Sequence, residues 1–261
     1  MKVQVFKNRY GQMIEDENYL TNRLIKNAGI SEGMRVLDLG CGKGDLSSIL
    51  AKAVGPWGEV VGIDRNRNIL EMAKHRLASQ NLSNVNFLSV DLSGPLPDIG
   101  MFDAIVGRRV LMYLSNPGDM LRNVLGHLKN SGIVAFQEVD SMVSPIQVLP
   151  HPLHEQVNKW IWDTLDMEGA NLNMGFALPS LLKQLGVVVD GVKAEANVQG
   201  PQSEAPLATV VRAILHRIVD QNVASYEEVD VQTLEARLNR ELSDGSVFIG
   251  DMSFAVWGRK V

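Results

Sequence analysis

The stretch Val36-Leu37-Asp38-Leu39-Gly40-Cys41-Gly42-Lys43-Gly44-Asp45 decides the fold of this chain. Its apolar start predicts a buried β-strand, and its three glycines at alternate positions predict a turn that leads into a helix. Gly40 permits a tight turn, Gly42 lets a ligand approach the backbone, and Gly44 lets the helix pack closely. Such a loop predicts a floor for a nucleotide-like ligand, although the same glycines also serve plain turns.

The composition limits the classes of protein to which the chain can belong. It has 261 residues, of which 45% are hydrophobic and 21% charged, as in ordinary globular proteins. The net charge of −5 argues against binding to the phosphate backbone of nucleic acid, and the short cluster Arg108-Arg109 does not reverse this. The single cysteine, Cys41, excludes an internal disulfide. We find no signal peptide and no apolar run of about eighteen residues, so we expect a cytoplasmic protein that does not bind a membrane.

Alternating strand and helix patterns predict a parallel α/β sheet around the glycine loop. Five short apolar runs are interpreted as strands, at residues 35–39, 59–63, 85–88, 104–106 and 132–136. Helical periodicity covers residues 15–28, 46–54, 69–80 and 119–129. The runs are nearly continuous and β-branched, which suits strands covered on both faces. This order implies a doubly wound sheet with right-handed crossovers.

The second half of the chain adds helices to this pattern. Residues 141–150 are interpreted as a loop, and Pro152 suits the first turn of a helix that ends near Met167. Further helices are predicted at residues 178–185, 205–221 and 227–242, a strand pair or one long strand at 186–198, and a last strand at 251–260.

We therefore predict a single Rossmann-like domain over residues 1–261. Its core is a mostly parallel seven-stranded sheet with an antiparallel C-terminal strand, at about residues 30–140, 178–200 and 247–261. Two helical insertions, at about residues 141–177 and 201–245, are predicted to form a lid over the C-terminal edge of the sheet, where ligands bind in this architecture.

Acidic residues and a glycine end the strands that follow the glycine loop. Asp64 closes the second strand, 20 residues after Gly44, where a carboxylate can accept hydrogen bonds from both ribose hydroxyls. Asp91 follows the third strand, at the position from which a carboxylate accepts from an adenine amine. The fourth strand ends at Gly107, where bare backbone can meet the ligand again.

These motifs closely resemble those of the class I S-adenosylmethionine-dependent methyltransferases. The glycine pattern of that family, Asp-x-Gly-x-Gly-x-Gly, occurs at residues 38–44, and the resemblance covers about residues 33–138. Residues 103–114 and 128–132 resemble the small-molecule branch, which includes ubiquinone- and menaquinone-type C-methyltransferases and natural-product tailoring enzymes. Asn130-Ser131-Gly132 departs from the Pro-Gly-Gly often found there, within a turn.

The resemblance implies S-adenosylmethionine as the cofactor and S-adenosylhomocysteine as the product. It implies that Asp38 and the loop backbone hold the methionine part, Asp64 the ribose and Asp91 the adenine amine. Tyr10 is interpreted either as a lid over the methionine end or as a surface tyrosine. The residues predicted to bind the cofactor are Tyr10, Asp38, Gly40, Cys41, Gly42, Asp64, Arg65, Asp91, Leu92, Gly107 and Arg108.

NAD(P) is the alternative ligand for such a loop. Dinucleotide folds prefer Gly-x-Gly-x-x-Gly and place a pyrophosphate at the helix N-terminus. Here the third glycine, Gly44, comes one residue early, and Asp38 places negative charge beside the loop. A carboxylate repels pyrophosphate and attracts the ammonium of a methionine moiety, which favours S-adenosylmethionine.

Candidates for a catalytic base are few. Glu138 lies at the end of the fifth strand, which faces the cleft in this fold, and His151 and His154 lie in the predicted lid. The plain alternatives are a solvated strand-end carboxylate and surface or helix-cap histidines. No carboxylate or cysteine cluster completes a ligand set with the two histidines, so no metal site is predicted. Arg108-Arg109 is interpreted as binding an acidic acceptor or as forming a salt bridge to a neighbouring helix.

Aromatic and methionine residues of the lid predict a hydrophobic or aromatic small acceptor, although such residues usually belong to a core. Tyr113, Trp160 and Phe176 are the predicted substrate-binding residues. The methyl group would pass by in-line displacement to an oxygen, nitrogen or carbon atom. The alternatives are a nucleic-acid methyltransferase, a protein methyltransferase, and a protein that binds the cofactor but catalyses another reaction such as cyclisation. Gly-Arg-Arg-Val follows the fourth strand in place of the Asn/Asp-Pro-Pro-Tyr of amino-methylating DNA enzymes.

Overall fold

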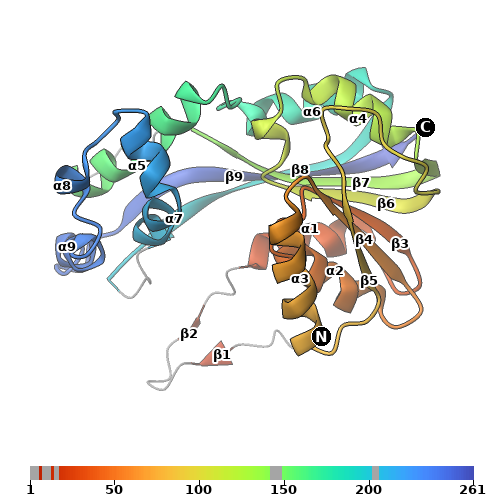
Figure 1. Ribbon diagram of the computed structural model, residues 1–261, viewed down its shortest axis with the longest axis horizontal. Coiled ribbons are helices and arrows are strands. Elements are labelled where there is room, and N and C mark those ends of the chain that lie inside the picture. The colour runs from red at the N-terminus through yellow and green to blue at the C-terminus, as the bar shows by residue number, and fades with distance from the viewer. Residues whose placement is uncertain (1–5, 8–12, 15–17, 142–148, 202–205) are drawn as a thin grey trace.

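A seven-stranded sheet forms the middle layer of the computed structural model, which describes residues 6–7, 13–14, 18–141, 149–201 and 206–261 (Figure 1). The strand order is β5-β4-β3-β6-β7-β9-β8. Its strands are β3 (Arg35–Leu39), β4 (Glu59–Asp64), β5 (Val85–Ser89), β6 (Phe102–Arg108), β7 (Leu128–Asp140), β8 (Val187–Gln199) and β9 (Phe248–Lys260). From β5 through β4, β3 and β6 to β7, neighbouring strands pair in parallel. Strand β9 runs antiparallel to both of its neighbours, β7 and β8. The predicted doubly wound sheet with an antiparallel C-terminal strand is confirmed.

The strand order reverses between β3 and β6, and this reversal fixes the place of the site. In open α/β sheets, ligands bind outside the carboxyl ends of the strands at such a switch point. The glycine loop follows β3, and Gly107 lies near the end of β6, so both flank this point. A separate two-stranded sheet, β1 (Phe6–Lys7) with β2 (Met13–Ile14), precedes the first helix.

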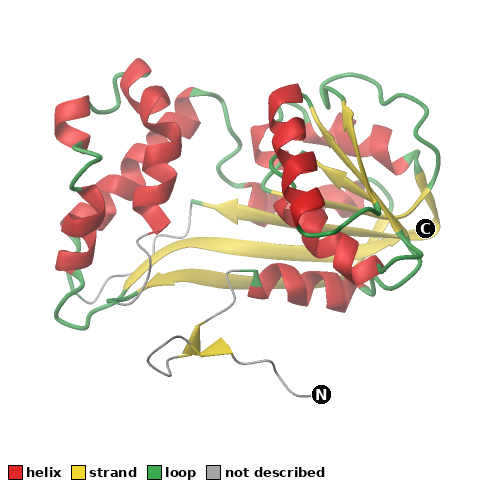
Figure 2. Cartoon of the chain, turned by 60° about the horizontal axis from the view of Figure 1, so that its bottom comes forward, coloured by secondary structure: helices red, strands yellow, loops and turns green. Residues whose placement is uncertain are grey.

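Helices cover both faces of the sheet (Figure 2). One face carries α1 (Tyr19–Ala28), α2 (Asp45–Val54) and α3 (Arg67–Ser79), and the other carries η1 (Leu111–Tyr113), α4 (Pro117–Leu125) and α6 (Met174–Gln184). Alternate strand residues serve the two faces: Val36 and Val60 pack with α1 and α2, whereas Leu37 and Val61 belong to the core cluster that contains α4 and α6. Such alternation is the period of a β-strand, and the burial of both faces explains the continuous apolar runs.

The remaining helices form a lobe at one end of the long strands β8 and β9, at the left of Figure 1. This helical lobe consists of α5 (Pro152–Met167), α7 (Pro206–Asp220), α8 (Tyr226–Val229) and α9 (Leu234–Glu241). Asp140, the last residue of β7, pairs with Met252, and β9 continues past it over residues 248–251. The lobe therefore lies beyond the carboxyl end of β7, and it joins parts of both predicted insertions.

Several predicted boundaries are wrong, for local reasons. Helix α4 ends at Leu125 rather than at residue 129, because Leu128 already pairs with Phe102 of β6. Helix α6 begins at Met174, four residues before the predicted start, and contains Pro179 in its interior. The predicted helix at 227–242 is divided into α8 and α9 by Asp230, whose φ of 40° is left-handed. Tyr10 and the predicted start of α1 at residue 15 lie outside the described residues.

Gly44 sets how closely α2 and α3 approach, which gives a test of the packing. Its φ is 78°, and a Cβ there would lie 2.9 Å from Leu77 Cδ1 and 3.2 Å from Ala73 Cβ of α3. We expect Gly44→Ala to lower the free energy of unfolding by about 2–4 kcal/mol, because overpacking adds to backbone strain. Urea unfolding measures this change.

Gly33 provides the matched control. Its φ is 83°, but a Cβ there would meet no atom within 4 Å. Gly33→Ala should therefore cost only about 1 kcal/mol, the strain of a left-handed residue. Equal losses in the two variants would show that contact with α3 does not constrain Gly44.

Candidate active site

The glycine loop is packed at both ends and open in the middle. Gly40, Gly42 and Gly44 all have left-handed φ values, of 62°, 50° and 78°. A Cβ on Gly40 would lie 2.5 Å from Val110 Cγ2, and one on Gly44 would contact α3, whereas one on Gly42 would have no atom within 4 Å. The space beside the Gly42 backbone is therefore open, and its role in ligand binding stays a prediction.

Asp38 is fully buried beneath this loop, and one of its oxygens lacks a partner. Ser47 donates a hydrogen bond to Asp38 Oδ2 at 2.5 Å, while Oδ1 has no hydrogen-bond partner among the described residues. Burial raises the pKa of Asp38 to about 7, although the Ser47 hydrogen bond and the Arg108 charge oppose this. An unsatisfied buried carboxylate oxygen is costly, and a cationic ligand group would satisfy it.

Asp64 joins β4 to the glycine loop. Its Oδ2 accepts from Gly42 N at 3.1 Å, and its Oδ1 accepts from Asn66 N at 2.9 Å. Cys41 N also donates to Ile63 O at 3.0 Å. These hydrogen bonds hold the Asp64 carboxylate beside Gly42, as its predicted role requires, with the exposed Arg65 next in sequence.

Asp91 and Cys41 differ in their exposure. Asp91 is exposed after β5 and accepts from Ser93 N and Ser93 Oγ at 2.9 and 2.8 Å, which hold its pKa below the usual range. Leu92, the next residue, is buried. Cys41 is buried as well, and burial raises the pKa of its thiol, so it stays protonated.

Arg108 connects the end of β6 to helix α1. Its Nη1 donates to Asn18 Oδ1 at 2.9 Å and to Thr21 Oγ1 at 3.3 Å. Thr21 in turn donates to Gln137 Oε1 of β7 at 2.6 Å. The predicted salt bridge to a neighbouring helix is thus replaced, for Arg108, by hydrogen bonds to neutral groups.

Glu138 is fully buried and holds the chain that follows β6. Its Oε1 accepts from Val110 N at 3.0 Å and from Leu111 N at 2.8 Å. Its Oε2 has no partner among the residues that the structure describes. Burial raises the pKa of Glu138 to about 7, although the hydrogen bonds from the backbone act to lower it. The alternative of a solvated strand-end carboxylate is excluded, because the side chain is fully buried.

Comparison with known proteins identifies the family to which the chain belongs. The family described as "Methyltransferase domain" matches residues 30–177. The chain belongs to this family of methyltransferases. The predicted membership of the class I S-adenosylmethionine-dependent methyltransferases is thereby confirmed.

Individual relatives agree with this assignment. The demethylmenaquinone methyltransferase of Staphylococcus aureus is 35% identical over 136 residues, which are 51% of this chain and 54% of that protein. The match thus spans about half the length of the curated relatives. Coclaurine N-methyltransferase bound to N-methylheliamine and S-adenosylhomocysteine aligns with a TM-score of 0.62 at 18% identity, over 98% of this chain and 76% of that one. The [4+2]-cyclase SpnF aligns with a TM-score of 0.57 at 20% identity, over 93% of this chain and 81% of that one. These two structures show the fold alone.

The two histidines of the methyltransferase belong to the helical lobe. His154 Nδ1 lies 2.6 Å from Glu241 Oε2, and His151 Nε2 lies 2.9 Å from Ser246 Oγ. Both rings pack on Phe248. Phe248 is six positions along β9 from Phe254, the partner of Glu138, which is about 20 Å at about 3.3 Å per residue. The structure therefore does not bring the histidines and Glu138 together.

The predicted substrate-binding residues differ in their exposure. Trp160 is buried in the core of the lobe, with 7% of its surface exposed. Tyr113 on η1 and Phe176 on α6 are 53% and 56% exposed. The Phe176 ring lies 4.7 Å from that of Phe254, and its backbone N–H donates to Asp140 Oδ2 at 3.1 Å. Phe176 is thus fixed at the end of β7 with half of its ring accessible.

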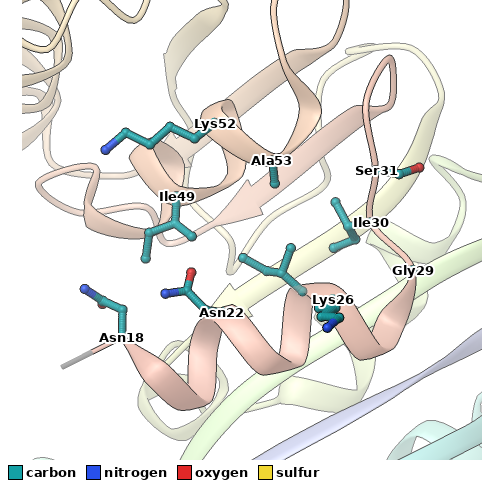
Figure 3. Close-up of a pocket in the computed structure, with 10 residues that line it drawn as sticks. Asn18, Asn22, Lys26, Gly29, Ile30, Ser31, Ile49, Lys52 and Ala53 are labelled. Carbon is teal, nitrogen blue, oxygen red and sulfur yellow. The ribbon is translucent and has the colours of Figure 1, made fainter. Parts of the chain in front are cut away.

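Figure 3 shows a groove of about 740 Å³ between α1 and α2, outside this site. Ile25, Ile30 and Ile49 line it, together with Lys26 and Lys52. It contains none of the predicted site residues. Within the described ranges, no three His, Cys, Asp or Glu side chains are arranged to hold a metal ion, and no helix is long and apolar enough to cross a membrane.

Sequence reasoning missed the polar residues that position the predicted ones. Ser47 donates to Asp38, whereas the adjacent Ser48 donates to Gln80 Oε1 at 2.6 Å instead. A hydroxyl early in α2 could have indicated a partner for Asp38, but the sequence does not show which of the two serines donates to it. Thr21 and Asn18 gave no signal, because their partner Arg108 is distant in sequence.

The raised pKa of Glu138 predicts how stability depends on pH. The carboxyl of the unfolded chain has its ordinary pKa of 4.5, whereas the pKa of the native one is about 7. The free energy of unfolding should therefore fall by about 3 kcal/mol from this residue as pH rises from 4.5 to 7. Glu138→Gln should remove that part of the fall, because glutamine does not ionise.

Urea unfolding at pH 5, 6 and 7 measures this effect, with the exposed Glu227→Gln as the control. The raised pKa of Asp38 also makes the free energy of unfolding depend on pH, and this contribution is the same in both variants. The same fall in Glu138→Gln as in the unaltered protein would show that Glu138 is ionised in the native state.

Proposed function

We propose that this chain is an S-adenosylmethionine-dependent methyltransferase that methylates a small hydrophobic or aromatic molecule. One observation carries the proposal: the open backbone at Gly42 follows, four residues on, the buried Asp38, whose Oδ1 lacks a partner among the described residues. A ligand that fits this place needs a cationic group that reaches Asp38 and a body that lies against the loop. S-adenosylmethionine has an ammonium group and a nucleoside, which meet both requirements.

Residues at the carboxyl ends of β3, β4 and β5 would hold such a cofactor. Asp38 would accept from its ammonium, and the backbone at Gly42 would contact its methionine part. Asp64, fixed beside Gly42, has further lone pairs with which to accept from the ribose hydroxyls. Asp91 would accept from the adenine amine, with Leu92 beside it. The switch point between β3 and β6 would hold the reacting end, next to Gly107.

The bound cofactor supplies a methyl group on a sulfonium, which carries its own leaving group. The chain therefore has to align the acceptor and exclude water rather than activate the donor. Glu138 fixes the backbone at Val110 and Leu111, and so shapes the acceptor side of the cleft. An acceptor that loses a proton also requires a base, and the pKa of that base should lie near the working pH.

We assign that role to Glu138 Oε2 rather than to the histidines. This oxygen lacks a partner, and the pKa of about 7 suits a proton acceptor. His154 is engaged by Glu241 and His151 by Ser246, within the helical lobe. Burial also lowers the pKa of His154, although the Glu241 hydrogen bond opposes this.

The exposed aromatic rings favour an apolar acceptor. Tyr113 on η1 and Phe176 on α6 present accessible rings, and both elements adjoin the carboxyl end of the sheet. The relative in Staphylococcus aureus is named for demethylmenaquinone, and an aromatic acceptor of that kind would stack on such rings. The helical lobe would act as the lid. The net charge of −5 favours a small molecule over nucleic acid.

The ionisation of Asp38 predicts that cofactor binding depends on pH. An ammonium binds the ionised carboxylate, and the native pKa is about 7. The affinity for S-adenosylhomocysteine should therefore rise about eightfold from pH 6 to pH 7.5, since the ionised fraction rises by that factor. Calorimetry at the two pH values measures it. Asp38→Asn should bind more weakly at pH 7.5 and show little change with pH. A pH-independent affinity in the unaltered protein would contradict the Asp38 contact.

Methyl transfer itself is tested with a labelled methyl donor and a panel of demethylated quinones, phenols and amines. We expect transfer to at least one apolar member, with Phe176→Ala raising its KM about tenfold because an aromatic contact is lost. Tyr226→Ala, an equally exposed ring on α8, is the control. Bound S-adenosylhomocysteine with no transfer to any acceptor would favour a non-methylating reaction such as cyclisation. An unchanged KM in Phe176→Ala would remove Phe176 from the acceptor site.

A further inference from the structure

Strand β8 forms one edge of the seven-stranded sheet. It pairs with β9 on one side, and within the described part of the chain no strand pairs with its other side. The exposed residues in its middle are Val192, Lys193, Ala194, Ala196 and Asn197. An open edge presents unpaired N–H and C=O groups to which another strand can add. Strand β8 is therefore a surface on which a further strand can pair.

The regular part of this edge is short and is bounded on both sides. The register of β8 against β9 shifts at residues 189–191 and again at residues 196–198. Such irregularities bend an edge and limit how far a further strand can pair with it. Between them lie residues 192–196, Val-Lys-Ala-Glu-Ala, which we call the edge segment.

The charges of the edge segment complement each other when the segment pairs with itself. In an antiparallel pair, opposed side chains point to the same face, so a two-fold axis between two copies passes through a residue. With the axis at Ala194, Lys193 of each copy faces Glu195 of the other. An axis at Lys193 or at Glu195 would instead place like charges opposite each other, which is unfavourable. The charges therefore select the register centred on Ala194.

The same register places apolar side chains together on one face of the joined sheet. Val192, Ala194 and Ala196 alternate with the charged residues and share a face. Val192 of each copy would meet Ala196 of the other, and the two Ala194 side chains would meet at the axis. Val192 is 45% exposed in the single chain, so this contact would remove apolar surface from water.

The charged residues lie on the opposite face, against which α1 packs. Glu195 Oε1 accepts from Arg23 of α1 at 2.9 Å, which fixes the carboxylate, and its second oxygen can accept from a lysine. No ion pair within the described ranges includes Lys193. A lysine alone on an edge discourages pairing. Here Glu195, two positions further on, makes one register with a second copy favourable.

We infer that the edge segment of β8 pairs with the same segment of a second copy of this chain, so that the two sheets join into one. This inference does not depend on the proposed function. Ala194 pairs with Phe254 of β9, on whose ring Phe176 packs at 4.7 Å. Three strand spacings separate the two copies of Phe254 across the axis, about 14 Å at about 4.8 Å each. The dimer would therefore bring the two Phe254 residues close to each other across its axis.

Sedimentation equilibrium of the full chain over a wide range of concentrations tests the inference. We expect a monomer–dimer equilibrium. Lys193→Glu should raise the dimer dissociation constant about tenfold, because two favourable cross-strand pairs become unfavourable. Combining Lys193→Glu with Glu195→Lys recreates opposite charges in the same register, so the double variant should recover most of the lost affinity.

Lys52→Glu is the matched control, because it makes the same change of charge at an exposed residue of α2, which packs against β3 and β4. It should leave the dissociation constant unchanged. An unaltered protein that stays monomeric at every concentration would overturn the inference. So would a dimer that Lys193→Glu does not weaken, or a folded double variant that is as weak as Lys193→Glu alone.

A disulfide tests the register without any change of charge. Opposed Cβ atoms in an antiparallel pair lie about 5 Å apart, close to the separation that a disulfide spans. Ala194→Cys should therefore form a covalent dimer on oxidation, seen on a non-reducing gel. Ala196→Cys, also exposed, should form little, because its two copies would lie about 13 Å apart along the strands. The native Cys41 is buried. Equal cross-linking of the two variants, or none in Ala194→Cys, would contradict the register.

Discussion

The close approach of Val110 to Gly40 is the constraint on which the site depends. A Cβ on Gly40 would lie 2.5 Å from Val110 Cγ2, so only glycine lets the loop after β3 pack against the chain that leaves β6. Glu138 of β7 holds the same segment through the N–H groups of Val110 and Leu111. Three neighbouring strands thus meet at Val110. Because β3 and β6 are also the strands between which the order reverses, this contact lies at the switch point of the sheet, outside which ligands bind in open α/β folds.

Two buried carboxylates flank this contact, and both are incompletely satisfied. Asp38 lies under the glycine loop and Glu138 under the chain after β6, and each has one oxygen without a partner in the described structure. Burial raises both pKa values to about 7. Such groups reduce stability in the free protein, because their ionisation is opposed while that of the unfolded chain is not. Unsatisfied buried polar groups of this kind are typical of sites where binding supplies the missing partner.

The arrangement of the residues that we propose to hold the cofactor was predictable from the sequence because its determinants are local. Gly40 to Gly44 stand in one loop, and Asp64 and Asp91 each end a strand whose apolar pattern is visible in the sequence. Parallel strands bring their carboxyl ends to one edge, so topology alone gathers these residues. The same reasoning did not reveal that Glu138 is buried, because a strand-end position does not show that the side chain turns into the core. It also did not separate Arg108 from Arg109, since the groups with which they interact, Asn18 and Glu138, are far apart in the sequence.

The helical lobe, which we propose as the lid, depends instead on contacts between distant parts of the chain. Glu241 of α9 accepts from the N–H groups of Leu153 and His154 and from the His154 ring, 87 residues away in sequence, and so supplies the cap that α5 otherwise lacks.

Asp251 of β9 accepts from Trp162 of the same helix at 2.6 Å, 89 residues away. Helix α5 is thus fixed near its start by α9 and further along by β9, and neither contact has a pattern in the sequence of α5. His151 and His154, at the start of that helix, have partners that the sequence did not indicate, Ser246 and Glu241. A lobe assembled in this way can change through its own substitutions, while the local geometry of the glycine loop stays the same.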